Sequence, residues 1–196
     1  MHPTMPDAIH NPVATLWLTG LSGAGKSTLA QAAREALHHA GIVTCLLDGD
    51  IVRAGLCSDL GFSPRDRREN IRRVAEVARL MNEAGVVVIA SLISPLHDDR
   101  ATARAIIGDP LFREVHIATS LAVCEQRDPK GLYAKARRGE IPEFTGISAP
   151  YEAPISPALR IDTAHTSIPD AVHQLLGLIG ISDLVLDTAP SVLLAQ

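Results

Sequence analysis

The chain of 196 residues has few cysteines and few aromatic side chains, and it lacks long apolar runs. Its three cysteines, Cys45, Cys57 and Cys124, are odd in number and far apart, which fits neither a disulfide framework nor a Cys-x-x-Cys zinc pattern. No apolar run approaches the roughly 20 residues that a membrane-spanning helix needs. The first dozen residues also lack the apolar segment of a signal peptide. We therefore expect a cytoplasmic protein without membrane contact.

An excess of positive charge is lacking as well. The sequence has 18 Lys and Arg against 22 Asp and Glu, a formal net charge of −4. Proteins that bind nucleic acid in general are usually basic, so we expect no nucleic-acid partner. With 46% hydrophobic residues the chain can bury a substantial core, and its length favours one domain.

Segments typical of strands and of helices alternate along the chain. Apolar runs predict strands at 14–20, 42–48, 86–93, 114–119 and 159–163, and helical spacing predicts helices at 26–40, 65–85, 97–107, 120–126 and 168–179. This alternation predicts an α/β fold, a five-stranded parallel sheet with helices on both faces. Ligands of such folds bind where the strands end. We interpret 13–181 as the domain, 1–12 as a flexible N-terminal tail and 182–196 as a C-terminal tail.

The clearest motif runs from Gly20 to Ser27 and matches G-x-x-x-x-G-K-[ST] in full, between a predicted strand and a predicted helix. Its glycines let backbone N–H groups point at phosphate oxygens, and the helix N-terminus adds its positive end. In this motif Lys26 contacts the β- and γ-phosphates, and the Ser27 hydroxyl ligates Mg²⁺. An Asn-Lys-x-Asp guanine motif is absent. We therefore predict a P-loop NTP-binding fold that takes ATP and Mg²⁺ at Gly20, Leu21, Ser22, Gly23, Ala24, Gly25, Lys26, Ser27 and Thr28.

Two carboxylates follow the second predicted strand, in "LLDGDIVR". A motor-type ATPase usually has an acid after a strand such as 86–93, but here that strand continues as "SLISP". Alternation along an extended segment would place Asp48 and Asp50 on the same side. One could then hold Mg²⁺ through water while the other accepts a proton from an attacking hydroxyl. The alternative is a polar Asp-Gly turn with solvated acids.

The predicted helix 65–85 begins with five arginines in nine residues. Helical spacing puts Arg67 and Asn70 on the same stripe as the apolar Ile71 and Val74. An arginine that prolongs a buried stripe is costly unless it meets an anion, so Arg67 and Asn70 are candidate ligand contacts. A solvated basic surface is the alternative.

Two of the three phenylalanines, Phe62 and Phe144, fall in glycine-containing loops outside the predicted core. Loop aromatics can stack on a planar base, a contact worth about 1–3 kcal/mol. Simple anchoring of the two loops is the alternative.

The positive, glycine-bounded segment 127–146, "RDPKGLYAKARRGEIPEFTG", predicts a mobile lid that keeps water away from the phosphates.

Between Thr15 and Glu152 these segments resemble the adenylylsulfate kinase (APS kinase) family. The resemblance is carried by "LWLTGLSGAGKST", "LDGDIVR", "LGFSPRDRRENIRRVAEVA", "ISP", "RDPKGLY" and "FTGISAPYEAP", in this order. It implies ATP-dependent phosphorylation of the 3′-hydroxyl of adenosine 5′-phosphosulfate (APS). The products would be 3′-phosphoadenylyl sulfate (PAPS), the activated form of sulfate, and ADP. It also implies a homodimer.

The resemblance further assigns roles by position. It places Asp50 near the 3′-hydroxyl, Asp48 on the metal through water, and Arg127 beside the ATP base. The substrate and lid contacts that it implies are Arg53, Phe62, Arg67, Asn70, Ile93, Ser94, Lys130 and Phe144.

Ser94 has been described in this family as a phosphoserine intermediate. No evident base lies near it in the sequence, so direct in-line transfer is the simpler mechanism. We keep Ser94 beside Lys26 and Asp50 at the reaction centre, as a ligand contact.

The sequence departs from the family after Pro95. The family usually has an aromatic residue or His and then Arg there, whereas this chain has Leu96 and His97, and Arg100 remains. Histidine is only partly charged near pH 7, which argues against an anion contact at this position.

Two other functions stay open. A P-loop kinase of a sugar acid or nucleoside would share the phosphate motif, but the pair Phe62 and Phe144 suits a nucleotide-like acceptor better than a sugar. A regulatory module that binds nucleotide without transfer would be expected to lack Lys26 or Asp50, and both are present.

Overall fold

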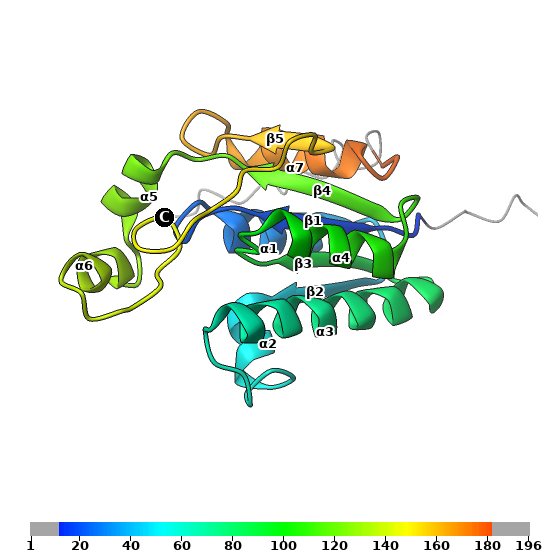
Figure 1. Ribbon diagram of the computed structural model, residues 1–196. Helices are drawn as coiled ribbons and strands as arrows, with labels where there is room; N and C mark the ends of the chain where they lie inside the picture. The colour runs from blue at the N-terminus through cyan, green and yellow to red at the C-terminus, as the bar shows by residue number, and fades with distance from the viewer. Residues whose placement is uncertain (1–11, 182–196) are drawn as a thin grey trace, which may run out of the picture.

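The computed structural model describes residues 12–181, so the predicted tails lie outside the described residues, apart from Pro12. Five strands form one parallel sheet in the order β2-β3-β1-β4-β5 (Figure 1). This confirms the predicted α/β fold. The strands are β1 (Thr15–Thr19), β2 (Thr44–Asp48), β3 (Val87–Ser91), β4 (Phe112–Ile117) and β5 (Leu159–Ile161).

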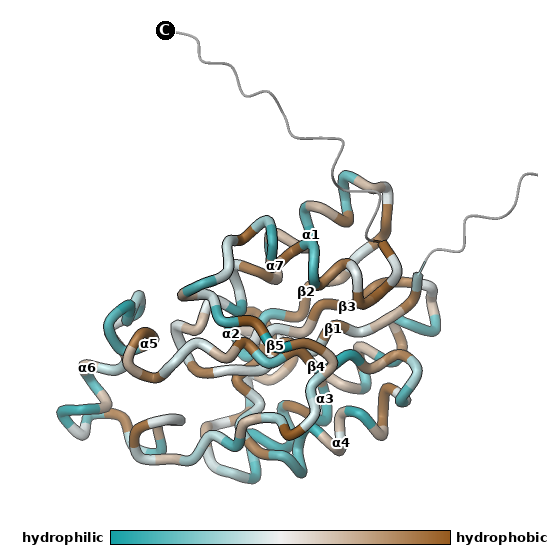
Figure 2. Tube along the Cα trace, turned by 90° about the horizontal axis from the view of Figure 1, so that it is seen from above, coloured by the Kyte–Doolittle hydropathy of each residue, from teal (hydrophilic) through white to brown (hydrophobic). Residues whose placement is uncertain are grey.

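Helices cover both faces of the sheet, as Figures 1 and 2 show. One face packs against α1 (Lys26–His39) and α7 (Ile168–Gly177), the other against α3 (Pro64–Glu83) and α4 (His97–Ile107). Successive residues of a strand point to opposite faces. Leu16 and Leu18 therefore join the core under α1, whereas Trp17 joins the core under α3. Among residues 12–181 no helix is long and apolar enough to cross a membrane.

Three short helices lie at the end of the sheet where the strands finish (Figure 1): α2 (Gly49–Ala54), α5 (Leu121–Arg127) and α6 (Leu132–Arg137). The sequence predicted α5, but neither α2 nor α6. The extended segment expected through Asp50 is wrong, because α2 begins at Gly49. Asp48 caps this helix, and its Oδ1 accepts a hydrogen bond from the backbone N–H of Asp50 at 3.0 Å.

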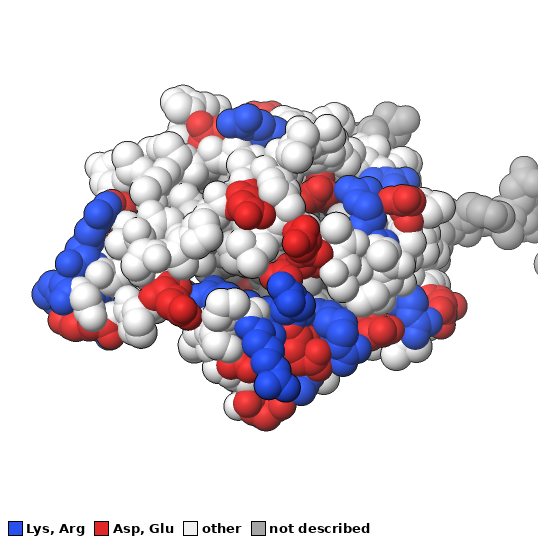
Figure 3. Space-filling model, viewed as in Figure 1, with Lys and Arg blue, Asp and Glu red and all other residues white. Residues whose placement is uncertain are grey.

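The arginines of α3 divide as the helical stripe predicts. Arg72 and Arg73 both donate to Glu69, and Arg79 donates to Glu76. Figure 3 shows side chains of both signs interleaved over this helix, so its outer face is a row of ion pairs. Arg67 is half-buried and points elsewhere, into the site described below.

Candidate active site

One cavity of about 890 Å³ lies at the carboxyl end of the sheet. The P-loop, α2, the start of α3, the loop after β3 and the segment 127–145 enclose it. The predicted site residues that line it are Ser22, Gly23, Gly25, Lys26, Ser27, Thr28, Asp48, Asp50, Arg53, Phe62, Arg67, Asn70, Ile93, Ser94, Arg127, Lys130 and Phe144. Gly20, Leu21 and Ala24 belong to the loop without lining the cavity.

The P-loop turns into α1 at Gly25, whose φ of 98° is left-handed. A Cβ there would lie 3.1 Å from Thr163 Cγ2, so glycine suits both the backbone angle and the close approach. No side chain caps the N-terminus of α1, which leaves its first N–H groups free for an anion.

Lys26 is buried beside this turn, and its Nζ donates to the Leu21 carbonyl at 2.7 Å. Burial lowers the pKa of this ammonium group to about 8, more than the neighbouring Asp48 carboxylate raises it. A buried ammonium with one carbonyl partner has donors left for phosphate oxygens.

Ser27 and Asp48 meet on the cavity wall. Ser27 Oγ donates to Asp48 Oδ2 at 2.7 Å, and Ser91 Oγ lies 3.5 Å from the same hydroxyl. A hydroxyl and a carboxylate are the oxygen donors that Mg²⁺ prefers, and Mg²⁺ keeps several waters. The pair therefore fits the predicted metal. Residues 12–181 hold no group of three His, Cys, Asp or Glu side chains that could bind a metal by themselves.

The segment predicted as a lid lies across the cavity and contacts α2 and α3. Lys130 forms an ion pair with Asp50 on α2. Arg67 donates through NH2 to the Glu143 carbonyl at 3.0 Å and lies 3.4 Å from Thr145 Oγ1. Thr145 was not predicted, although the string "EFTG" could have indicated it.

Two guanidinium groups flank an aromatic ring on this side. The guanidinium carbons of Arg53 and Arg67 lie 4.4 and 5.7 Å from the centroid of Phe62. Arg53 donates to the Gly61 carbonyl at 2.8 Å, and Arg67 Nε to the Phe62 carbonyl at 2.8 Å. Burial lowers the pKa of both groups. Positive charge is thus concentrated on the cavity wall, where an anion would be stabilised.

Asn70 and Ser94 complete the wall and are both buried. Asn70 Oδ1 has no hydrogen-bond partner among the described residues, so it is available to a ligand. Ser94 Oγ accepts from the Trp17 indole N–H at 3.2 Å. No carboxylate or imidazole of residues 12–181 bonds to this hydroxyl, which favours a contact over a nucleophile.

Phe62 and Phe144, the two loop aromatics predicted to stack on a planar base, line the same cavity but differ in burial. Phe62 is 62% exposed. Phe144 is only 9% exposed, because it packs edge-on against Tyr133 of α6, with ring centroids 5.1 Å apart. The prediction that Phe144 lies outside the core is wrong: the lid segment folds back and adds this ring to the core under α1.

Arg127 lies beside Thr163 and the P-loop, whereas His97 lies beside Arg100 of α4. Arg127 donates to Thr163 Oγ1 at 2.7 Å, and Thr163 Oγ1 donates to the Ala24 carbonyl of the P-loop at 2.8 Å. His97 does not line the cavity. Its Nδ1 lies 2.9 Å from an Arg100 guanidinium nitrogen, so the residue that departs from the family pattern contacts Arg100.

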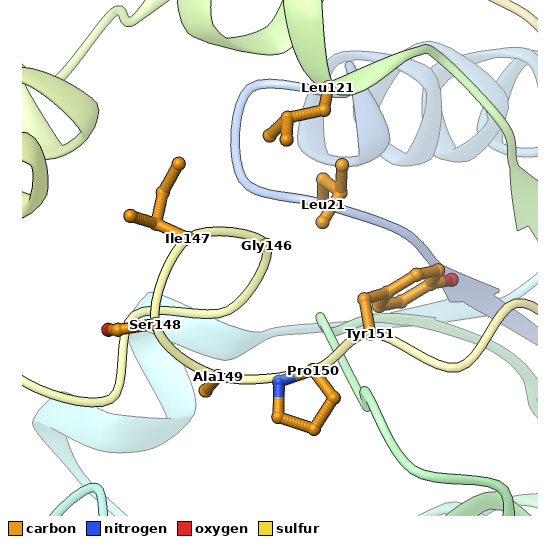
Figure 4. Close-up of a pocket in the computed structure, with 8 residues that line it drawn as sticks. All are labelled: Leu21, Leu121, Gly146, Ile147, Ser148, Ala149, Pro150 and Tyr151. Carbon is orange, nitrogen blue, oxygen red and sulfur yellow. The ribbon is translucent and has the colours of Figure 1, made fainter.

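A second hollow of about 530 Å³ lies where the lid segment returns to the P-loop. Figure 4 shows Leu21 and Leu121 facing Gly146. A Cβ on Gly146 would lie 3.0 Å from Leu21 Cδ2. The end of the lid segment therefore packs closely on a P-loop side chain.

Known proteins are similar to this chain in sequence and in fold. The family model for adenylylsulphate kinase matches residues 12–162. The adenylyl-sulfate kinase of Shewanella oneidensis is 58% identical over 175 residues, which cover 89% of this chain and 85% of that protein. That of Shewanella sp. ANA-3 is 60% identical over 166 residues, 85% of this chain and 80% of that protein.

Solved structures agree. The APS kinase of Mycobacterium tuberculosis, in complex with AMPPNP and APS, matches with a TM-score of 0.83 and 47% identity, over 86% of this chain and 98% of that chain. A gluconokinase from Sinorhizobium meliloti matches with a TM-score of 0.55 and 16% identity, over 87% and 93%, which shows a common fold alone. By its sequence and its fold, the chain belongs to the adenylylsulphate kinase family.

Proposed function

We propose that this chain transfers the γ-phosphoryl group of ATP to the 3′-hydroxyl of APS, giving PAPS and ADP. One observation carries the proposal: a single cavity joins the P-loop to a wall that holds Arg53, Arg67 and Phe62. An acceptor with both an anionic group and a planar base suits that wall better than a sugar acid does. The APS complex of the Mycobacterium tuberculosis enzyme supports the same acceptor.

On the donor side, the P-loop N–H groups and Lys26 bind the phosphates of ATP. Lys26 exchanges the Leu21 carbonyl for phosphate oxygens and stabilises the negative charge that develops during transfer. Arg127 fixes Thr163 against the P-loop and borders the nucleotide base. The AMPPNP complex of the relative supports ATP as the donor.

Ser27 and Asp48 are the residues that would hold Mg²⁺, Asp48 through water. Bound there, the ion would neutralise charge on the phosphates of ATP.

On the acceptor side, Arg53, Arg67 and Asn70 bind the phosphosulfate and ribose, while Phe62 and Phe144 border the adenine. Asp50 accepts the proton of the 3′-hydroxyl while the hydroxyl oxygen attacks the γ-phosphorus. The bond between the γ-phosphorus and the β–γ bridging oxygen breaks, and ADP leaves. Lys130 pairs with Asp50 in the structure. Phosphate oxygens give this lysine alternative partners once the substrates are bound. Ser94 and Ile93 form part of the wall.

The segment 127–146 acts as a lid. Its contacts at Asp50 and Arg67 reach the acceptor side, so closure excludes water once both substrates are in place.

We further propose a homodimer, which sedimentation velocity would test. We also propose a cytoplasmic location, because Cys45, Cys57 and Cys124 are all free thiols.

The direct test is incubation with Mg²⁺, γ-labelled ATP and APS, followed by separation of the nucleotides. We expect label at the 3′-position only when both substrates are present, and none with Lys26→Ala. Label on a sugar acid instead, or no transfer by a protein that binds ATP, would contradict the proposal.

A further inference from the structure

Arg100, on α4, lies outside the cavity and is 2% exposed. Its guanidinium group contacts segments that are far apart in the sequence. Nε donates to Glu114 Oε1 of β4 at 2.7 Å, and NH2 lies 2.9 Å from His97 Nδ1. Guanidinium nitrogens only donate, so Nδ1 of His97 is the acceptor. Two backbone carbonyls, those of Ser94 and Glu152, accept the remaining bonds at 2.8 and 2.7 Å.

The first of these carbonyls belongs to the acceptor wall, the part of the cavity lining formed by Arg53, Phe62, Arg67, Asn70, Ile93 and Ser94. Ser94 has a φ of +38°, a strained backbone angle for a non-glycine residue that persists only where the surroundings enforce it. The enforcing contacts are visible. Trp17 donates to its hydroxyl, Thr19 donates to the Ile93 carbonyl at 2.7 Å, and Arg100 donates to its carbonyl. The wall therefore keeps its shape through buried groups behind it.

The second carbonyl belongs to the segment that follows the lid. Glu152 also donates its N–H to the Pro95 carbonyl at 2.8 Å, and its Oε2 accepts from the His97 N–H at 2.7 Å. The preceding Tyr151 has its hydroxyl 3.1 Å from Thr19 Oγ1, and its ring stacks on His116. The same stretch, 146–151, lines the hollow in Figure 4. The lid segment is thus fastened to the acceptor wall at its far end.

We propose that Arg100 is a positioning residue that couples the acceptor wall to the lid. One rigid guanidinium plane holds the Ser94 and Glu152 carbonyls together. It therefore fixes the position of the acceptor wall relative to the segment that follows the lid. This inference rests on the proposed function, because it concerns how APS is received.

Replacing Arg100 with lysine keeps the positive charge but removes the planar guanidinium group that holds the two carbonyls. An ammonium group still pairs with Glu114, but it is a point charge and does not bond four acceptors in one plane. For Arg100→Lys we therefore expect the KM for APS to rise about tenfold, because small displacements of a binding wall are costly. The KM for ATP should stay within about twofold.

Arg104 supplies the matched control. It lies one turn further along α4, and its guanidinium lies 3.3 Å from Asp109 and 3.5 Å from Glu114 Oε2. It contacts neither Ser94 nor Glu152. Arg104→Lys should therefore leave both KM values within about twofold of the wild type.

Trp17 gives a reading that does not depend on turnover. It is the single tryptophan of the sequence, and its indole N–H donates to Ser94 Oγ. With a non-hydrolysable ATP analogue present, its emission should saturate with APS in all three proteins. Arg100→Lys should need about tenfold more APS, in line with its KM.

An Arg100→Lys protein that behaves like Arg104→Lys in both measurements would overturn the inference and leave the proposed function intact. A wild type that does not phosphorylate APS would contradict the function instead. Thermal unfolding shows whether the variants fold. If Arg100→Lys does not fold, a second pair of variants makes the same comparison. His97→Ala removes a contact of Arg100, and Asp98→Ala, at an exposed position of α4, is its control. We expect about a threefold rise in the KM for APS for His97→Ala alone, and an equal KM in the two would overturn the inference.

Discussion

At the residue scale, burial disfavours the charged form of Lys26, and a bound ligand can offset this cost. Lys26 is buried with a single carbonyl as its hydrogen-bond partner, and its pKa falls to about 8 as a result. Phosphate oxygens would stabilise the charged form. Binding of a nucleotide and protonation of Lys26 are therefore linked.

This linkage predicts a pH dependence of nucleotide affinity. In the free protein, Lys26 loses its proton as the pH rises through about 8. The binding-competent charged form then becomes scarce, and the Kd for ADP should rise about tenfold between pH 7 and pH 9. Calorimetry in two buffers with different ionisation enthalpies should also detect proton uptake. Lys26→Arg stays charged and should give a flat profile; a flat profile in the wild type would contradict the linkage.

Asp50 allows a test of proton transfer. Asp50→Asn keeps the shape of the side chain but removes the base, so transfer should slow by about 10²–10⁴-fold while the Kd for ATP is unchanged. Asp98→Asn is the control, because Asp98 is exposed on α4 and does not line the cavity. Full activity of Asp50→Asn would remove Asp50 from the mechanism.

The two phenylalanines should respond differently because they differ in burial. Phe144→Ala removes a core ring and its contact with Tyr133, so it should lower the free energy of unfolding by about 3–5 kcal/mol. Phe62→Ala should cost less than about 0.5 kcal/mol, since its ring is exposed. It should instead weaken APS binding by about 1–3 kcal/mol. Urea unfolding and the KM for APS measure the two effects; an unchanged KM for Phe62→Ala would argue against stacking.

Local periodicity in the sequence predicts the site residues that lie on a regular helix. Arg67 and Asn70 were predicted because a helical stripe fixes their direction, and both line the cavity. Arg100 could not be given a role, since its partners Glu114 and Glu152 are distant in the sequence. Phe144 is predicted outside the core because it falls in the glycine-containing loop "EFTG", whereas its ring packs on Tyr133 of α6, a helix that the sequence does not predict.

At the element scale, α2 and α6 are the helices of residues 12–181 that the sequence did not predict. The four long helices carry enough periodic positions to show their type, and apolar runs mark the five strands. α2 and α6 have six residues each, too few for a helical pattern to stand out. The consequence was specific: the direction of Asp50 was derived from an extended segment, whereas it lies in the first turn of a helix.

The lid segment has a contact that can be tested with matched glycines. Gly146 and Gly139 have φ values of +91° and +76°, so alanine strains the backbone at both. Only at Gly146 would the added Cβ meet a neighbour, Leu21, which must then shift. We expect Gly146→Ala to release more ADP from ATP without acceptor, because a displaced lid admits water. Equal release by the two variants would show that the contact with Leu21 does not seat the lid.

At the scale of the whole molecule, ligand binding should appear as added stability. A nucleotide analogue at 100 times its Kd adds about 2.7 kcal/mol to the free energy of unfolding. For a domain of this size that corresponds to a rise in Tm of about 5–10 °C. Differential scanning calorimetry measures it, with Lys26→Ala as the control that should show no rise. An equal rise in Lys26→Ala would place the nucleotide away from the P-loop.

The order of strands in the sheet also governs how the chain folds while it is being made. Thr15 of β1 pairs with Val88 and with Phe112, and β2 pairs with β3. β1 and β2 therefore have no partner in this sheet until residues 87–91 leave the ribosome. Meanwhile β1, buried along its whole length in the finished protein, exposes an apolar segment. We therefore expect chaperones that recognise apolar segments to bind β1 of the nascent chain before its sheet partners are made.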